Sequence, residues 1–187
     1  MNKALHHTNQ HMGAFLKQIL GSGLPLLTGT GNPEARLLIA YDMPSREDIT
    51  AASPFHRPEN RLDEMLKETG ISTEDTYRTY IIKFVPQGKR PSYEEEALSL
   101  PWFAKEIETV HPKAVILLGA TALSMLGIHE PLAKVYGQAM QLELYGTSCS
   151  MVPLHHPDRL RQADMEAFRA GLRTAARMIY DTDRYPS

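Results

Sequence analysis

Short apolar runs alternate with amphipathic segments along most of this 187-residue chain. Each apolar run is bounded by Gly, Pro, Asn or His, and such runs are typical of strands covered on both faces of a sheet. The runs span about residues 36–41, 77–85 and 114–118, and two further extended segments around Gly146 end at Pro153. Apolar residues recur at helical spacing elsewhere, which predicts helices over about 12–20, 59–68, 92–110, 120–126 and 164–180.

This order of strands and helices predicts a three-layer α/β/α fold with a central, mostly parallel, four-stranded sheet. The chain is long enough for one substantial core, so a single domain is expected to span residues 1–187. Residues 1–12 are polar, and we expect them to form a loose tail. Their histidines, His6, His7 and His11, are interpreted as solvated rather than metal-binding.

Side chains that could take part in catalysis or binding follow the predicted strands. They lie at the edge of the sheet where open α/β folds bind their ligands. Asp42 comes directly after the first strand, and Pro44 stiffens the loop beyond it. That loop runs to Pro58, and loops of such length in compact domains are usually functional. Phe55 lies within it, and His156 follows the last strand. Each candidate also has a plain structural alternative: an Asx turn for Asp42, core packing for Phe55 and a turn position for His156.

The composition is that of an ordinary globular protein, with 42% apolar and 22% charged residues. A net charge of -2 argues against extensive non-specific binding to nucleic acid, but it leaves room for a local basic face. Cations gather in the predicted loops, namely Arg57, Arg61, Lys83, Lys89, Arg90, Arg159 and Arg161. Scattered surface charge is the alternative interpretation of the same residues.

Cys149 is the only cysteine, so the chain can form neither an internal disulfide nor a cysteine-rich metal cluster. Because it lies in an apparent strand, an inert buried thiol is a better interpretation than a nucleophile. The sequence contains no apolar run of the roughly 20 residues that span a bilayer. The N-terminus also lacks the apolar core of a signal peptide. We therefore expect a cytoplasmic protein that neither contacts a membrane nor holds a metal.

Each of these signals is weak alone, but six segments in a fixed order along the chain form a specific pattern. They are GNPEARLLI (31–39), AYDMPS (40–45), SPF (53–55), KFVPQGKR (83–90), LLGATA (117–122) and PLHHPDRL (153–160). Together they resemble the uracil-DNA glycosylase superfamily, and most closely its family 4, the iron–sulfur type. The resemblance covers roughly residues 20–180. It implies that family's α/β fold and a monofunctional DNA glycosylase that leaves an abasic site.

The resemblance also implies roles for individual residues. Asp42 occupies the position of the family's glutamate, which stabilises the cationic sugar or orients a water. His156 matches the histidine that donates to a base carbonyl as negative charge develops. Phe55 matches the aromatic residue that stacks on the flipped base.

The implied partner is DNA, double- or single-stranded, bound by a monomer. Leu160 is the residue expected to enter the minor groove as an apolar wedge, with Arg159 or Arg161 on phosphates. The remaining candidates for DNA contact are the loop cations Arg57, Lys89 and Arg90.

The chain departs from family 4 at the four positions where the resemblance places the cysteines of the iron–sulfur cluster. These positions hold Gly21, Leu24, Phe84 and Ser99. We therefore expect no cluster and no other cofactor, with Phe84 and Leu24 filling the space by apolar packing.

A second departure concerns recognition of the base. Tyr80 stands where family 4 reads uracil with an asparagine, and a hydroxyl cannot reproduce the donor and acceptor of an amide. Tyr41 replaces a glycine where the backbone lies close to the substrate. We therefore expect a remodelled base-binding site, including Tyr41 and Tyr80, that acts on a modified pyrimidine. A role in antiviral defence or DNA modification would then be as natural as one in DNA repair.

Two alternatives remain open from the sequence. One is a uracil-DNA glycosylase proper, and the other is a catalytically weak DNA-binding protein on the same scaffold. A nucleotide-binding α/β protein is disfavoured because the chain lacks a phosphate-cradling glycine loop. The residues alone leave open which base is excised and which form of DNA is preferred.

Overall fold

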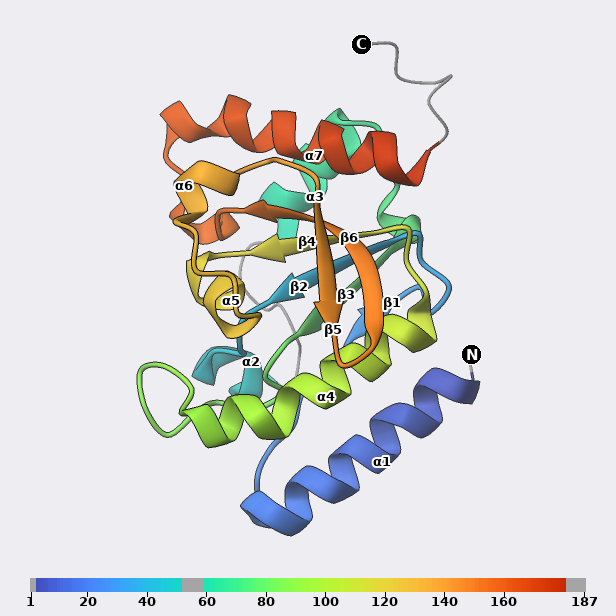
Figure 1. The fold of residues 1–187 in the computed structure, drawn as a ribbon, viewed down its shortest axis with the longest axis vertical. Coiled ribbons are helices and arrows are strands. Elements are labelled where there is room, and N and C mark those ends of the chain that lie inside the picture. Colours follow the sequence, from blue (N-terminus) through green and yellow to red (C-terminus); the bar gives the residue numbers. More distant parts are fainter. Residues whose placement is uncertain (1–2, 52–58, 181–187) are drawn as a thin grey trace.

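The structure, a computed structural model, describes residues 3–51 and 59–180 and is built around a six-stranded sheet (Figure 1). The strands are β1 (Thr30–Gly31), β2 (Leu37–Tyr41), β3 (Thr76–Tyr80), β4 (Ala114–Leu118), β5 (Met140–Leu144) and β6 (Thr147–Leu154). They lie in the order β1-β3-β2-β4-β6-β5. The central four, β3, β2, β4 and β6, are parallel, whereas β1 and β5 pair antiparallel to their neighbours.

The prediction of a mostly parallel sheet is confirmed, but the expected count of four strands is wrong. The two extended segments expected around Gly146 are both strands of the sheet, β5 and β6, and the short strand β1 was not expected. β5 and β6 form a hairpin whose turn residues, Tyr145 and Gly146, have φ values of 48° and 79°. Tight hairpin turns of the primed types need such positive values. β1 has only two residues, which is too short to leave a pattern in the sequence.

The strand predicted over residues 77–85 ends early, at Tyr80. The next two amides, of Ile81 and Ile82, still donate to the carbonyls of Tyr41 and Asp42, at 2.8 and 2.9 Å. The chain then bends away from the sheet. The apolar run continues past the strand because Ile81, Ile82 and Phe84 are themselves buried.

Helices cover both faces of the sheet and give the expected three layers (Figure 1). One face carries α1 (Lys3–Leu20) and α4 (Tyr93–Val110), and the other carries α3 (Glu59–Glu68) and α7 (Met165–Ile179). Successive strand residues point to opposite faces, so Leu38 packs with the first helix pair and Leu37 with the second. The shorter helices are α2 (Arg46–Thr50), α5 (Ala120–Met125), α6 (Leu132–Val135) and the 3₁₀ turns η1 (Thr73–Asp75), η2 (Pro157–Arg159) and η3 (Gln162–Asp164).

The loose tail expected at residues 1–12 is wrong from residue 3 onward, because α1 begins at Lys3. Its buried residues, Leu5, Thr8, Met12 and Leu16, recur every three or four positions and form one face against the core. Polar and histidine side chains separate these residues, which hid the helical period. The other predicted helices are confirmed with small shifts of their ends. Among the described residues, no helix is long and apolar enough to cross a membrane.

Candidate active site

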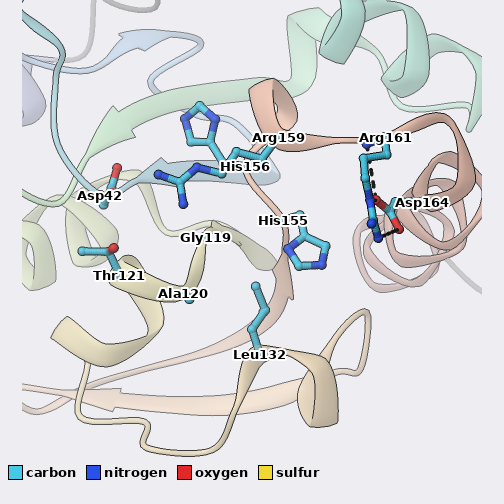
Figure 2. Close-up of a pocket in the computed structure, with 10 residues that line it drawn as sticks. All are labelled: Asp42, Gly119, Ala120, Thr121, Leu132, His155, His156, Arg159, Arg161 and Asp164. Atoms are coloured by element: carbon cyan, nitrogen blue, oxygen red, sulfur yellow. Dashed lines mark hydrogen bonds and ion pairs between the residues drawn. The ribbon is translucent and has the colours of Figure 1, made fainter.

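A cavity of about 650 Å³ opens at the carboxyl edge of the central strands (Figure 2). Because β2, β4 and β6 are parallel and in register, the residues that follow them meet at this edge. α5, α6 and the turns after β6 form the other walls. The lining residues are Asp42, Gly119, Ala120, Thr121, Leu132, His155, His156, Arg159, Arg161 and Asp164.

Asp42 is the carboxylate at the end of β2, as the sequence predicts. Its Oδ1 accepts a hydrogen bond from the Met43 amide at 2.9 Å, and its carbonyl accepts from Ile82. The side chain therefore bonds to the adjacent residue and not two residues on, as an Asx turn requires. Burial raises the pKa of Asp42, while the Met43 amide, His156 and Arg159 lower it. This carboxyl group thus changes charge at a higher pH than an exposed aspartate.

The loop after Asp42 continues into the short helix α2, which the sequence pattern did not predict. Ser45 and Asp48 form a capping box: the Ser45 amide and hydroxyl donate to Asp48 Oδ2 at 2.7 and 2.6 Å. The Asp48 amide donates back to the Ser45 hydroxyl at 3.1 Å. These bonds fix the chain directly after Pro44 and so limit the positions open to Asp42.

His156 lines the cavity and contacts one of the two predicted base-binding tyrosines. The rings of His156 and Tyr41 meet edge to face, with centroids 5.4 Å apart. Tyr41 in turn contacts Tyr80, with ring centroids 5.9 Å apart. Both tyrosines are buried, with exposed fractions of 8% and 2%. The structure thus brings Asp42, His156, Tyr41 and Tyr80 together, but the two phenol rings pack beside the described cavity and do not line it.

Leu160, the residue predicted to enter the minor groove, is buried in this structure. Its side chain is 7% exposed and belongs to the core on the α3 and α7 face. Its carbonyl accepts from Arg61 at 3.4 Å.

The two arginines that flank Leu160 both line the cavity but point in different directions (Figure 2). Arg161 is paired with Asp164, through Nε to Oδ2 at 2.9 Å and a second nitrogen to Oδ1 at 3.2 Å. Arg159 reaches across the cavity toward Asp42 and Thr121. The loop after β6 therefore supplies one arginine that pairs with a neighbouring carboxylate and one that is directed at the candidate catalytic carboxylate, Asp42.

Lys83 is a further correction, because it was grouped with the exposed loop cations. Its ammonium is 1% exposed and lies 2.6 Å from the Glu106 carboxylate. Burial lowers the pKa of Lys83, and Glu106 opposes that effect. Lys83 is therefore part of the core between β3 and α4 and does not reach the cavity.

The remaining candidates are placed less directly. Lys89 and Arg90 are exposed on the loop between β3 and α4 and are not among the residues that line the cavity. Phe55 and Arg57 lie outside the described residues. Cys149 is buried on β6, and burial raises the pKa of its thiol to about 11, as suits an inert side chain.

Several cavity residues were not singled out from the sequence as site residues: Gly119, Ala120, Thr121, Leu132, His155 and Asp164. Gly119 and Thr121 lie in the LLGATA segment (117–122), one of the six that resemble the family. Their position directly after β4 was the signal in the sequence that could have identified them. Gly119 has φ 101°, and its amide donates to the Leu154 carbonyl at 2.8 Å. The glycine thereby joins the ends of β4 and β6 in a conformation that other residues rarely adopt.

The residues at the four cysteine positions of family 4 do not suit a cluster held by thiolates. Phe84 and Ser99 are buried, with exposed fractions of 2% and 1%, and Leu24 packs against the same core as Phe84. None of these side chains supplies sulfur, and the only cysteine lies on β6.

Comparisons with known proteins show the family of this chain. The model of the uracil DNA glycosylase superfamily matches residues 28–177. A type-4 uracil-DNA glycosylase from Thermotoga maritima is 32% identical over 139 residues, covering 72% of this chain and 71% of that protein. The type-4 enzyme of Archaeoglobus fulgidus is 25% identical over 136 residues, or 69% and 68% of the two chains. That of Saccharolobus solfataricus is 28% identical over 137 residues, or 69% and 63%.

Proposed function

This chain belongs to the uracil DNA glycosylase superfamily and is a DNA glycosylase, and we propose that it excises a flipped, modified pyrimidine with Asp42 and His156 as catalytic residues. The observation that carries the proposal is the placement of Asp42 and His156 on one cavity, next to two buried tyrosines at the base-recognition positions. The first feature supports base excision, and the second supports a substrate other than plain uracil.

Asp42 is the group proposed to act on the sugar side. The bond between C1′ and the base nitrogen breaks with its electron pair moving to the base, which leaves cationic character on the sugar. A carboxylate stabilises that charge and accepts a proton from the water that adds to C1′. The raised pKa of Asp42 makes it a better proton acceptor than an exposed aspartate.

His156 is the group proposed to act on the base side. As the base departs with the electron pair, negative charge grows on its carbonyl oxygen, and a ring N–H of His156 donates to that oxygen. The edge contact with Tyr41 restricts the orientation of the imidazole. Because the donor is oriented before the bond breaks, it need not reorganise as charge develops.

The substrate proposal rests on Tyr80 and Tyr41. A carboxamide pairs with a pyrimidine edge through one donor and one acceptor, whereas a phenol presents a single hydroxyl. Here both phenols are buried against each other, so plain uracil loses its matched partner. The adjoining cavity of about 650 Å³ is in the usual range for small-molecule sites and has room beyond a single pyrimidine ring. A base that carries a polar substituent suits this polar cavity better than uracil.

Two further candidates each have an observation in their favour. Excision of uracil is favoured by the printed names of the relatives, which are uracil-DNA glycosylases. A DNA-binding protein with weak catalysis is favoured by the close packing of Tyr41 and Tyr80 at the base-recognition positions. We also propose that the chain works without an iron–sulfur cluster, as supported by its single cysteine and by the packed core around Phe84.

The test is excision from defined oligonucleotides. Duplex and single-stranded DNA carrying uracil, a hydroxymethylpyrimidine or a glycosylated pyrimidine is incubated with the protein and then treated with alkali, which breaks abasic sites. Breaks at a modified pyrimidine that exceed those at uracil, and that disappear in Asp42→Asn, support the proposal. Uracil excision as fast as that of any other base supports the first alternative. Tight DNA binding without breaks in any substrate supports the second.

A further inference from the structure

The direction of Arg159 is set by the packing of the η2 turn. The Leu160 amide donates to the Pro157 carbonyl at 3.2 Å, which makes this a 3₁₀-type turn. In such a turn residues three apart lie on one side, and Pro157 and Leu160 are both buried. The Arg159 amide donates to the His156 carbonyl at 3.0 Å. With both ends of the turn anchored in this way, Arg159 is presented on the opposite side, at the cavity.

Figure 2 shows where the guanidinium of Arg159 lies. It extends toward Asp42, and its charge is among those that act on this carboxyl group. Arg161 points away from Asp42 and is held by Asp164. Of the two arginines on this loop, Arg159 is the one directed at the candidate catalytic carboxylate.

Among the described residues, the charged groups around Asp42 come from several elements. The loop after β6 contributes His156 and Arg159, and the rest of the cavity holds His155 and the Arg161–Asp164 pair. α5 contributes only uncharged groups, and the end of β3 contributes an amide bonded to the Asp42 backbone. The Asp48 carboxylate on α2 is engaged in its own capping box, and the neighbouring phenols are Tyr41 and Tyr80.

Burial and this set of charges act on Asp42 in opposite senses. Burial raises the pKa of the carboxyl group, and His156 and Arg159 both lower it. On the proposed function, His156 is engaged with the base. Among the described residues whose charge lowers the pKa of Asp42, this leaves Arg159.

We propose that Arg159 acts inside the cavity, as the positioning cation that keeps Asp42 negatively charged during base excision, and not as a contact to the DNA backbone. The inference rests on the proposed role of Asp42. It assigns the two arginines of the loop different tasks: Arg159 serves the reaction, and Arg161 remains the candidate for phosphate contact. An arginine suits this task because its planar guanidinium presents N–H donors in a geometry that matches a carboxylate.

The experiment compares Arg159→Gln and Arg159→Lys with a matched control, Arg177→Gln, an exposed arginine on α7. Single-turnover excision is measured from pH 5 to 9 with saturating protein. We expect Arg159→Gln to shift the acid limb of the rate profile to higher pH and so to lower the rate on that limb. Arg159→Lys should restore most of the profile, and the control should match the wild type.

A second measurement separates this proposal from the proposed function. The carboxyl carbon of Asp42 is titrated by ¹³C NMR in the wild type and in Arg159→Gln, without DNA, so the readout needs no activity. A higher midpoint in the variant supports the proposal even where no tested base is excised. An unchanged midpoint overturns it. A second outcome also overturns it: Arg159→Gln keeps a normal rate profile but binds DNA more weakly, and the slope of log affinity against log salt concentration falls by about one. That is the behaviour of a residue that contacts a phosphate.

Discussion

The Nζ of Lys83 donates to Oε2 of Glu106 at 2.6 Å, and the exposed fractions of the two side chains are 1% and 2%. Lys83 also donates to the Tyr80 carbonyl at 2.6 Å. The hydroxyls of Tyr77 and Thr79 donate to the same carboxylate from β3. This network ties α4 to the end of β3 and fixes the backbone at Tyr80, the residue proposed to remodel base recognition.

Breaking this buried pair should strongly destabilise the fold. Lys83→Met leaves the Glu106 charge buried without its partner, and removing one member of a buried pair typically costs about 3–5 kcal/mol. The double variant Lys83→Met/Glu106→Leu should cost less than Lys83→Met alone, because no charge is stranded. Urea unfolding provides the measurement.

The chain offers a matched control for that experiment. Lys105 and Glu108 pair at 3.0 Å on the exposed face of α4, with side-chain exposures of 51% and 57%. Lys105→Met should cost less than about 1 kcal/mol, as exposed pairs do. A Lys83→Met variant as stable as Lys105→Met would show that the buried pair contributes little.

The parts of the fold that follow from local pattern could be predicted from the sequence. β4 occupies the expected residues 114–118, and α4 begins after the expected cap, Ser92, which forms a capping box with Glu95. Asp42 and His156 reach one cavity because parallel strands end at a common edge. Each of these features depends on periodicity, caps or strand order, which neighbouring residues encode.

The features that sequence reasoning missed depend on distant partners. The burial of Lys83 requires Glu106, which lies 23 positions away on α4. Leu160 is buried because α3 and α7 present apolar residues to it, and nothing within its own loop reports that. The direction of Arg159 follows from the same burial. Local composition predicts cations in the loops around Lys83 and Arg159. Whether such a cation faces the cavity depends on the tertiary packing.

Asp42→Asn should abolish excision while leaving the fold intact. General acid–base and charge-stabilising groups contribute about 10²- to 10⁴-fold to a rate, so a loss of that size is expected. Asparagine still accepts from the Met43 amide and removes the cost of burying a charge, so the melting temperature should not fall. Single-turnover kinetics and a thermal melt check both. A retained rate would assign the sugar-side role to another group.

The pH dependence of the wild type follows from the environment of Asp42. Burial raises its pKa above the ordinary value of 3.8, so the carboxylate is lost on acidification earlier than in an exposed aspartate. Excision should therefore fall on the acid side at a pH above 3.8, as Asp42 becomes protonated. A rate profile from pH 4 to 8, with folding followed by circular dichroism, separates this titration from unfolding. A rate that stays constant to the acid limit contradicts it.

Leu160→Ala should act on stability more than on DNA binding. The side chain is buried in the core, and truncating a buried leucine costs about 2–5 kcal/mol. A wedge that inserts only into DNA would instead leave unfolding unchanged and weaken binding to duplex. Urea unfolding and duplex affinity, measured on the same variant, distinguish the two roles. Normal stability together with weaker binding to duplex DNA would instead support the role of Leu160 as a wedge in the minor groove.

Tyr80→Asn should shift the preference of the enzyme toward uracil. The asparagine restores an amide with one donor and one acceptor at the end of β3, so the pyrimidine edge regains a matched partner. Sites that supply such bonds discriminate strongly against bases that lack the matching groups. The measurement is the ratio of single-turnover rates on uracil and on the preferred modified pyrimidine. Tyr80→Leu is the control, since it also removes the phenol but supplies no polar group. If both variants change the ratio equally, the effect comes from space vacated beside Tyr41, and the hydrogen-bonding account of specificity is wrong.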